Sequence, residues 1–235
     1  MKQLVAEAAT FGLELSPQQI AHFEHYQELL QSWNRRINLT SVDDAEGIRT
    51  RHFLDSLTCA TVTGDLGDRR LIDVGAGAGF PGIPLKILYP RLDLTLVESV
   101  TKKVNFLEAV LAALRIDDVE VLDARAEEVG QMEDHRQQYD WAVARAVAPL
   151  NVLVEYLLPL CRLGGRVLAM KSERAQEEAQ EAAQAIAKLG GGQVDFHPIK
   201  LPGRTEASYL VTIEKIKPTP STYPRRPGMP AKRPL

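Results

Sequence analysis

The residues best suited to chemistry lie in a glycine-rich stretch that follows a short apolar run, 71–74. The glycines alternate with other residues and are Gly75, Gly77 and Gly79. Glycine has no Cβ, so the chain can turn sharply here and bring its backbone amides close to a ligand. Two prolines follow where a helix would begin, a position at which proline loses no hydrogen bond. The order of strand, glycine loop and helix indicates a nucleotide-binding corner.

Two residues in this stretch distinguish between nucleotide ligands. A dinucleotide fingerprint reads Gly-x-Gly-x-x-Gly, but Phe80 occupies the position where the last glycine would fall. Asp73 precedes the loop by two residues, where its carboxylate would repel a pyrophosphate. An acidic residue at a strand tip suits a ligand that carries an ammonium and a sulfonium. The sequence therefore predicts an S-adenosylmethionine site, and a plain tight turn is the simpler alternative.

Carboxylates also end the next two apolar runs. Glu98 follows the run 92–97 and lies 23 residues after Gly75, the spacing at which a second-strand carboxylate binds the two ribose hydroxyls. Asp123 ends the run 119–122. Because the carboxyl ends of parallel strands meet at one edge of a sheet, we expect these groups around one crevice. For Glu98 the alternative is a solvated surface acid.

Two cationic residues end later strands. Arg145 ends the run 139–145 and could bind the cofactor carboxylate, orient a base or pair with Asp73. Lys171 ends the run 165–171 and is a candidate for a phosphate or base contact. Both are candidates for positioning the acceptor base, and no residue is assigned as a catalyst. Methyl transfer from a sulfonium is a direct displacement, which needs a base only if the acceptor must lose a proton.

The kind of atom that accepts the methyl group can be inferred by elimination. Methylation of exocyclic amino groups commonly uses an Asp/Asn-Pro-Pro-Tyr-like turn after the fourth strand, and the sequence around Arg145 has no such turn. Carbon-5 methylation of a pyrimidine needs an activated thiolate, and neither Cys59 nor Cys161 has a cationic or Pro-Cys setting. What remains is an acceptor with a free lone pair, such as a ring nitrogen of guanine.

Composition sets the wider limits. The 235 residues suffice for one α/β domain with a modest extension, and 45% hydrophobic and 25% charged residues are ordinary values. A net charge of −3 gives no general attraction to nucleic acid, so RNA binding must come from local patches. Two isolated cysteines and five histidines without ligand spacing predict no disulfide framework and no metal site. No membrane-spanning run or signal peptide is evident, so we expect a cytoplasmic protein.

The predicted elements alternate along most of the chain. Strands are expected at 92–98, 119–122, 139–145, 165–171, 193–199 and 208–215, and helices at 101–115, 150–162 and 173–189. This alternation predicts an α/β fold with a doubly wound, mostly parallel sheet of the class I S-adenosylmethionine-dependent methyltransferase type. The last two strands, joined by the stretch 201–205, should form a hairpin at the edge of the sheet. Residues 70–215 are the predicted methyltransferase domain.

Residues 1–69 are predicted to form a helical extension packed on that domain. Ser16 begins a capping-box sequence with proline at the next position, and apolar residues then recur at helical spacing. The segment 33–41, which is polar for one that holds a tryptophan, should end this helix. Arg49, Arg51 and His52 follow, and they could meet phosphates or simply form a solvated helix face.

The last residues differ in kind from the rest. From Lys215 to Leu235 there are six prolines, six basic residues and no acid. Proline at that density opposes a helix and favours an extended, solvated chain. The segment 216–235 is therefore predicted to be a basic tail that contacts a phosphate backbone, or else a disordered solubilising tail.

The glycine loop and its flanks, 73–84, resemble the signature loop of the glucose-inhibited division protein B family. The similarity continues in the segments 38–41, 51–56, 98–103, 125–127, 144–146, 170–171 and 223–228. Members of that family are bacterial methyltransferases that modify N7 of one guanine in 16S ribosomal RNA. The run 79–84, Gly-Phe-Pro-Gly-Ile-Pro, interlocks two glycines and two prolines and makes this resemblance much more specific than a generic methyltransferase loop.

The resemblance implies roles for individual residues. Gly75 and Phe80 would contact the methionine part of the donor, Glu98 the ribose, and Ala126 and Glu127 the adenine. Arg145 would lie where donor and acceptor meet. The candidate cofactor-binding residues are therefore Asp73, Gly75, Gly77, Gly79, Phe80, Glu98, Ala126, Glu127 and Arg145.

The sequence as a whole predicts a cytoplasmic, monomeric enzyme that uses S-adenosylmethionine and no metal to methylate N7 of a guanine in 16S ribosomal RNA. Two alternatives stay open, a nucleotide-binding oxidoreductase and a non-catalytic RNA-binding assembly factor on the same fold. The partner would be the ribosomal RNA or the small ribosomal subunit, and no membrane. Whether naked RNA, a precursor particle or the mature subunit is the substrate is not decided by the sequence.

Overall fold

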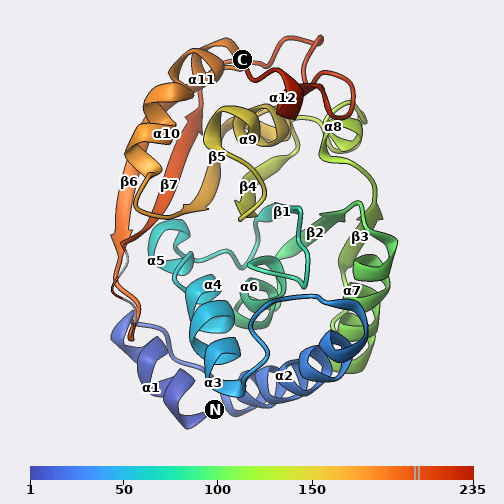
Figure 1. Ribbon diagram of the computed structural model, residues 1–235, viewed down its shortest axis with the longest axis vertical. Coiled ribbons are helices and arrows are strands. Elements are labelled where there is room, and N and C mark those ends of the chain that lie inside the picture. The colour runs from blue at the N-terminus through green and yellow to red at the C-terminus, as the bar shows by residue number, and fades with distance from the viewer. Residues whose placement is uncertain (204, 206) are drawn as a thin grey trace.

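A seven-stranded sheet runs through the centre of the computed structural model, which describes residues 1–203, 205 and 207–235 (Figure 1). The strand order is β3-β2-β1-β4-β5-β7-β6. The strands are β1 (Arg70–Val74), β2 (Asp93–Glu98), β3 (Val119–Asp123), β4 (Tyr139–Arg145), β5 (Cys161–Lys171), β6 (Gly191–Ile199) and β7 (Ser208–Lys215). The strands β1 to β5 pair in parallel, and β7 is antiparallel to both of its neighbours. The predicted doubly wound, mostly parallel sheet is confirmed.

The strand order reverses beside β1, and this fixes where a ligand can bind. The chain moves outward from β1 through β2 to β3, then returns to add β4 on the other side of β1. Connections that diverge in this way open a crevice outside the carboxyl ends of the strands. The glycine loop follows β1, so it lies at this point of the sheet.

Helices cover both faces of the sheet (Figure 1). They are α1 (Lys2–Thr10), α2 (Pro17–Ile37), α3 (Ala45–Gly47), the π-helix η1 (Ile48–Leu54), α4 (Asp55–Leu57), α5 (Ala60–Thr63), α6 (Gly82–Leu88), α7 (Thr101–Leu114), α8 (Ala126–Val129), α9 (Leu150–Leu157), α10 (Ala175–Glu181), α11 (Ala183–Lys188) and α12 (Met229–Lys232). Alternate strand residues enter two hydrophobic cores, because successive side chains point to opposite faces. Leu71 packs with residues of α2, α6 and α7, whereas Ile72 packs with residues of α9 and α11.

The first long helix begins as its sequence predicts. Ser16 Oγ accepts a hydrogen bond from Gln19 N at 3.3 Å, and Gln19 Oε1 accepts one from Ser16 N at 2.8 Å, which confirms the capping box of α2. The helix ends at Ile37, and Asn38 follows in the left-handed conformation with φ of 47°. Tyr26 on α2 donates its hydroxyl hydrogen to Ala78 O, so this helix is tied directly to the glycine loop.

Several predicted boundaries are wrong. Helix α9 ends at Leu157 instead of residue 162, because Pro159 follows closely and the residue before a proline is disfavoured in helix. Strand β5 then begins at Cys161, four residues earlier than predicted. The predicted helix 173–189 is divided at Ala182 into α10 and α11. The strands β6 and β7 pair as the predicted antiparallel hairpin, but Arg204 in the connecting stretch 201–205 lies outside the described residues.

The C-terminal segment is not the extended, solvated chain that its prolines predict. Arg136 on the loop before β4 donates hydrogen bonds to the carbonyl oxygens of Thr219, Pro220 and Tyr223. Arg225 forms a bidentate pair with Glu155 on α9, a residue whose side chain is 0% exposed. The segment also contains the short helix α12, which begins with Met229 and Pro230, where proline is tolerated. Composition alone could not reveal these partners, because they lie on distant parts of the chain.

Across residues 1–203, 205 and 207–235, no helix has the length and the apolar surface needed to cross a bilayer.

Arg225→Ala should destabilise the protein by about 2–4 kcal/mol, because it leaves the buried Glu155 carboxylate without its cation. Urea unfolding measures the change in free energy. Arg226→Ala is the matched control, since Arg226 is the next residue and is exposed. Equal, small effects of the two substitutions would show that the Arg225–Glu155 pair does not hold the segment in place.

Candidate functional site

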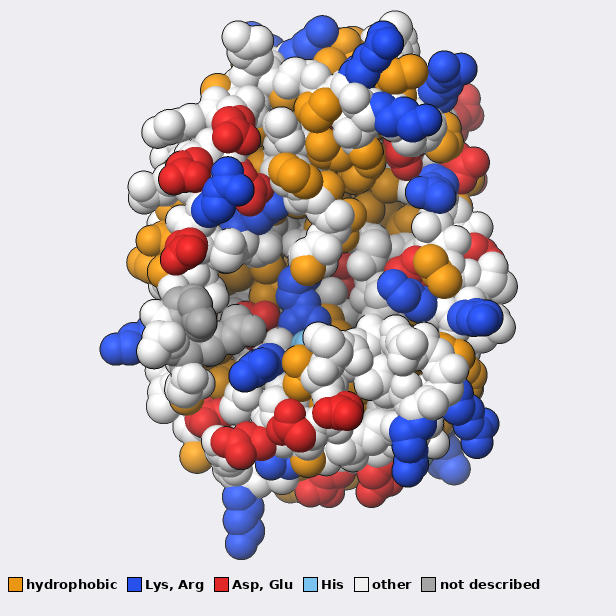
Figure 2. Space-filling model, in the orientation of Figure 1, with side chains coloured by type: hydrophobic (Ala, Val, Ile, Leu, Met, Phe, Trp, Pro, Cys, Tyr) orange, Lys and Arg blue, Asp and Glu red, His pale blue; other side chains and the backbone are white. Residues whose placement is uncertain are grey.

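A crevice of about 870 Å³ opens at the carboxyl ends of β1, β4 and β5, and Figure 2 shows this face of the molecule hollowed near its centre. Its wall combines the segments 39–42 and 51–58, the glycine loop, the β4–α9 loop, the end of β5 and the start of β7. Of the cofactor and base-positioning residues predicted from sequence, the crevice is lined by Gly75, Gly77, Phe80, Arg145 and Lys171. Arg51 and His52, for which a phosphate contact was one alternative, also line it, and Arg49 does not. The structure places Asp73, Gly79, Glu98, Ala126 and Glu127 outside that lining.

The backbone amides of the glycine loop are bonded within the protein. Gly75 N and Ala76 N both donate to Val97 O of β2, at 2.8 and 3.0 Å. Gly77 N donates to Glu98 Oε2 at 3.0 Å. A loop that binds pyrophosphate must instead present its amides to the phosphate oxygens. This arrangement disfavours the dinucleotide-dependent oxidoreductase.

Each glycine of the loop meets a different steric demand. All three have positive φ, at 72°, 60° and 91°, a conformation that side-chain-bearing residues rarely adopt. A Cβ on Gly75 would lie 2.6 Å from Val147, and one on Gly79 would lie 2.6 Å from the Tyr26 hydroxyl. A Cβ on Gly77 would meet nothing closer than Gly75 O at 3.8 Å. Gly75 and Gly79 are therefore needed for packing, whereas Gly77 keeps open the space beside the crevice.

Asp73 lies buried beneath this loop. Its Oδ2 accepts a hydrogen bond from Gly82 N at 2.8 Å, which ties the end of β1 to the first residue of α6. Its Oδ1 is buried without a hydrogen-bond partner among the described residues. Burial raises the pKa of Asp73 to about 7, although the Gly82 N–H and the Arg145 charge act in the opposite direction. A buried acceptor of this kind fits a ligand with a hydrogen-bond donor, such as an ammonium.

Glu98 is also buried, at 6% exposure, and its carboxylate is fixed by backbone donors. Oε1 accepts from Ser99 N at 2.8 Å and from Val100 N at 2.9 Å, while Oε2 accepts from Gly77 N. A carboxylate has about four acceptor positions, so these three bonds leave room for one further donor. That capacity is compatible with a ribose hydroxyl.

The predicted adenine residues lie on the short helix α8. Glu127 is 4% exposed, and its Oε1 accepts a hydrogen bond from Gly228 N of the C-terminal segment at 2.8 Å. The C-terminal segment therefore packs directly against this part of the proposed cofactor site.

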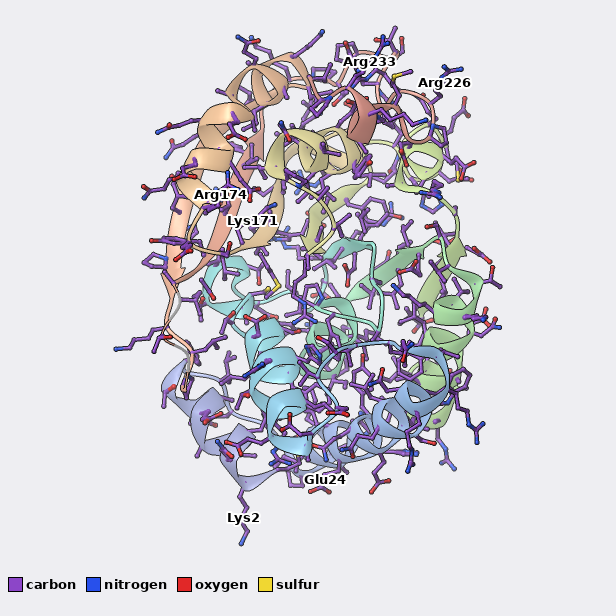
Figure 3. All side chains as sticks on the ribbon, in the orientation of Figure 1. Lys2, Glu24, Lys171, Arg174, Arg226 and Arg233 are labelled. Atoms are coloured by element: carbon purple, nitrogen blue, oxygen red, sulfur yellow. The ribbon has the colours of Figure 1, made fainter. Side chains whose placement is uncertain are left out.

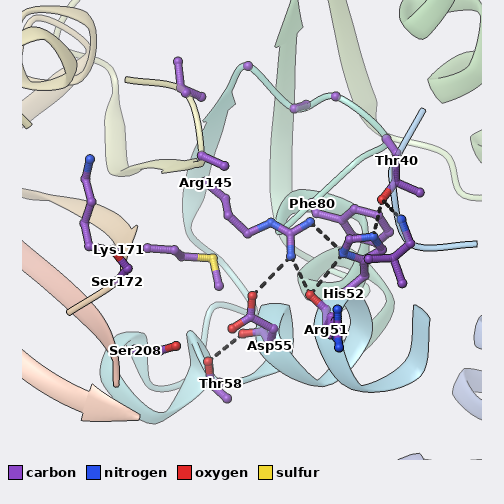
Figure 4. A pocket seen from close by; sticks show the side chains of 18 of the residues that line it. Thr40, Arg51, His52, Asp55, Thr58, Phe80, Arg145, Lys171, Ser172 and Ser208 are labelled. Atoms are coloured by element: carbon purple, nitrogen blue, oxygen red, sulfur yellow. Dashed lines mark hydrogen bonds and ion pairs between the residues drawn. The ribbon is translucent and has the colours of Figure 1, made fainter. Parts of the chain in front are cut away.

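Arg145 is held over the Phe80 ring at the floor of the crevice (Figure 4). Its Nη1 donates to Arg51 O at 2.9 Å and to Asp55 Oδ2 at 3.2 Å. Its Nη2 lies 3.2 Å from His52 Nδ1, and Cζ lies 4.9 Å from the centre of the Phe80 ring. The ion-pair partner of Arg145 is therefore Asp55, not Asp73 as one of the sequence interpretations had it.

Sequence reasoning missed the residues that fix Arg145, since His52 was expected to meet a phosphate or lie on a solvated helix face and Asp55 was assigned no role. His52 and Asp55 come from η1 and α4, and His52 stacks on Phe80 with ring centres 4.6 Å apart. His52 Nε2 lies 2.8 Å from Thr40 Oγ1, which brings the segment after α2 to the same place. A regular helical pattern over 49–57 would put the apolar residues inward, and it gives no signal for the π-helical turn that also buries His52. The resemblance covered this segment but gave it no role.

Lys171 lines the other side of the crevice from Phe80 (Figure 4). Its Nζ donates to Ala148 O at 2.6 Å and to Glu178 Oε2 at 2.7 Å. The sequence had suggested a phosphate or base contact for Lys171 and had not identified Glu178. Across the part of the chain that the structure describes, no group of three or more His, Cys, Asp or Glu side chains is arranged to hold a metal ion.

Comparison with known proteins gives matches along the chain. A family model described as rRNA small subunit methyltransferase G matches residues 19–205. The Ribosomal RNA small subunit methyltransferase G of Roseiflexus castenholzii is 53% identical over 235 residues, which is 100% of both chains. Among solved structures, a SAM-dependent O-methyltransferase from Thermotoga maritima has a TM-score of 0.54 at 14% identity, and covers 81% of this chain and 72% of that one. The complex of M. jannaschii TYW2 with AdoMet has a TM-score of 0.51 at 15% identity, over 65% of this chain and 72% of that one.

Asp73→Asn should change how stability depends on pH. The folded-state pKa of about 7 exceeds the ordinary value of 3.8, so the folded protein holds this proton more tightly than the unfolded chain. The resulting stabilisation is full below about pH 4 and is lost as the pH rises to about 7. Between these limits the wild type should lose up to about 4 kcal/mol relative to Asp73→Asn, whose side-chain oxygen can still accept from Gly82 N.

Urea unfolding at steps from pH 4 to pH 8 measures this difference. Asp68→Asn is the control, because Asp68 has a 78% exposed side chain and should leave the curve parallel to that of the wild type. Parallel curves for Asp73→Asn as well would show that Asp73 is ionised in the folded protein throughout this range.

Proposed function

The chain belongs to the rRNA small subunit methyltransferase G family, and we propose that it transfers a methyl group from S-adenosylmethionine to N7 of a guanine in 16S ribosomal RNA. The crevice beside the glycine loop is the proposed active site. The observation that supports this most directly is the loop itself, whose amides bond to β2 while Gly77 keeps an open surface beside Arg145. Such a loop suits a cationic donor better than a pyrophosphate.

The residues present fit S-adenosylmethionine, which would supply a methyl group made reactive by its sulfonium. Gly75, Gly77 and the Phe80 edge would receive the methionine part. Glu98 would accept from one ribose hydroxyl through its remaining lone pair, and the segment at Ala126 and Glu127 would border the adenine. Two buried carboxylates, Asp73 and Glu98, keep the loop in place and favour a cationic ligand. The AdoMet bound by TYW2, a protein similar in fold, supports the choice of cofactor.

The chemistry asks little of the protein beyond alignment. N7 of guanine has a free lone pair, so the new carbon–nitrogen bond can form as the carbon–sulfur bond breaks, without removal of a proton. Bound S-adenosylmethionine would supply the methyl group and keep the electrons of the broken carbon–sulfur bond, so the positive charge would pass to the base. Arg145, fixed by Asp55, Arg51 O and the Phe80 ring, would position donor and acceptor against each other. Because Asp55 pairs with Arg145, the guanidinium adds little net positive charge where the base becomes cationic.

The RNA would reach this site through local basic patches. Arg51 and Lys103 line the crevice. Arg226 and Arg233 are exposed at the end of the molecule formed by the C-terminal segment (Figure 3). Arg225 is excluded from this role because it pairs with Glu155. We place the reaction in the cytoplasm, with a monomer acting on the RNA or on the small subunit.

Transfer of a labelled methyl group tests the proposed activity. The wild type should label small-subunit particles or 16S RNA that lack the modification, and mass mapping of fragments should place one methyl group on N7 of one guanine. Gly77→Ala should lower the rate at least about tenfold, because a Cβ there is strained at φ of 60° and enters the open space. No labelling of either substrate would support the alternative, an assembly factor without activity.

The role of the C-terminal segment is tested by replacing three of its exposed cations with glutamine, at Arg226, Lys232 and Arg233. If each contacts a phosphate, the plot of the logarithm of the RNA association constant against the logarithm of salt concentration should become less steep. Its slope should fall by about 2 to 3 in magnitude, since each phosphate contact contributes about 0.7–0.9. S-adenosylhomocysteine affinity should stay unchanged. An unchanged slope would assign these cations to solubility alone.

A further inference from the structure

The ion pair formed by Lys171 and Glu178 has hydrogen-bonding groups that its contacts within the protein do not use. Lys171 ends β5 and Glu178 lies on α10, and both line the crevice. Their side chains are 10% and 17% exposed, and Nζ lies 2.7 Å from Oε2. In Figure 4, Lys171 lies on one side of Arg145 and Phe80 on the other. The pair therefore borders the crevice away from the glycine loop.

The two oxygens of Glu178 have different surroundings. Oε2 accepts from Leu150 N, the first residue of α9, at 2.8 Å and from Lys171 Nζ. Oε1 has no hydrogen-bond partner among the described residues, and it is not sealed from solvent. The structural role of Glu178, capping α9 and pairing with Lys171, is thus fulfilled by one oxygen. The other is an oriented acceptor in a crevice.

Lys171 has a matching unused donor. An ammonium carries three N–H groups, and two of them bond to Ala148 O and Glu178 Oε2. The third N–H of Lys171 and the free Oε1 of Glu178 belong to side chains in direct contact. Side by side, they present one donor and one acceptor to whatever occupies this part of the crevice.

We propose that Lys171 and Glu178 recognise the Watson–Crick edge of the guanine, an inference that rests on the function proposed above. Lys171 donates to O6, and Glu178 Oε1 accepts from N1–H and the N2 amino group. Guanine alone presents an acceptor followed by two donors along this edge. Adenine and cytosine place an amino donor where O6 would be, and uracil has no second adjacent donor.

The arrangement also orients the base for the reaction. N7 lies on the Hoogsteen edge of guanine, which adjoins the Watson–Crick edge at O6 and is remote from the N2 amino group. A base whose N1–H and N2 amino group meet Glu178, and whose O6 meets Lys171, therefore holds N7 on the far side of O6 from Glu178, toward the rest of the crevice, which Arg145 and the glycine loop also line. The same hydrogen bonds would then both select guanine and align its N7 for methyl transfer.

The proposal is tested by removing the contact between the guanine N2 amino group and Glu178 Oε1 in two ways, once by a change in the RNA and once by a change in the protein. On the RNA, inosine at the target position lacks the N2 amino group but keeps N7. On the protein, Glu178→Gln keeps an oxygen that can accept from Leu150 N and Lys171 Nζ. Its amide NH₂ group then faces the crevice, where it cannot accept hydrogen bonds from guanine N1–H and the N2 amino group. Glu177→Gln is the matched control, because Glu177 precedes Glu178 on α10 and has a 68% exposed side chain.

Single-turnover rates with enzyme in excess give the readout. For the wild type and Glu177→Gln, inosine should lower the rate about tenfold relative to guanosine. Glu178→Gln should lower the rate on guanosine about 100-fold, with an inosine-to-guanosine ratio close to one and unchanged S-adenosylhomocysteine affinity. A merely structural role of Glu178 would not alter this ratio.

Equal rates of the wild type on guanosine and inosine would overturn the proposal without need of any variant. So would a Glu178→Gln protein that keeps the tenfold discrimination. Absence of methyl transfer by the wild type to guanosine RNA would instead contradict the proposed function itself, so the two failures are distinguishable.

Discussion

Two buried carboxylates hold the glycine loop from below, and the rest of the site depends on them. Glu98 at the end of β2 accepts from Gly77 N, and Asp73 in β1 accepts from Gly82 N at the start of α6. The loop is therefore fixed at its middle and at its exit by acceptors that belong to the sheet. Because amides of the loop donate to acceptors within the protein, the loop suits a ligand that does not depend on several backbone N–H donors, as a pyrophosphate does. The carboxylates also make this corner of the sheet favourable for a positive charge.

The end of the loop connects the sheet to the N-terminal helices. Phe80 lies between Tyr26, whose ring is 5.5 Å away, and His52, whose ring is 4.6 Å away. Arg145 lies over the same ring and pairs with Asp55. The N-terminal helices are thus part of the site, since they supply the groups that orient the cation at its centre. A methyltransferase sheet without them would leave Arg145 without its ion-pair partner.

Much of the fold follows from the sequence because it depends on local patterns. Apolar runs that end in polar residues gave the strands, and their alternation with helical patterns gave a doubly wound sheet. The glycine loop was located in the same way, because positive φ at three alternating positions leaves a residue-type signature. The family was recognised from the same segment, since its glycines and prolines are constrained by both backbone conformation and packing.

What could not be predicted depends on contacts between distant residues. Nothing in the neighbourhood of Glu178 indicates that it caps a helix 28 residues earlier, and Glu155 does not indicate that it pairs with Arg225. The same limit applies to Arg145, for which the sequence suggested Asp73 as a partner and gave no sign of Asp55, 90 residues earlier. Proline content suggested an extended C-terminus because composition reports only the intrinsic conformational preference of a segment. The contacts of this segment with Arg136 and Glu155 override that preference.

Calorimetric titration of the purified protein with two ligands tests the central claim most directly, namely that this loop is built for a sulfonium-type donor. S-adenosylhomocysteine should bind with one-to-one stoichiometry, and NADH should give no saturable heat at the same concentrations. Saturable NADH binding together with no response to S-adenosylhomocysteine would contradict the claim.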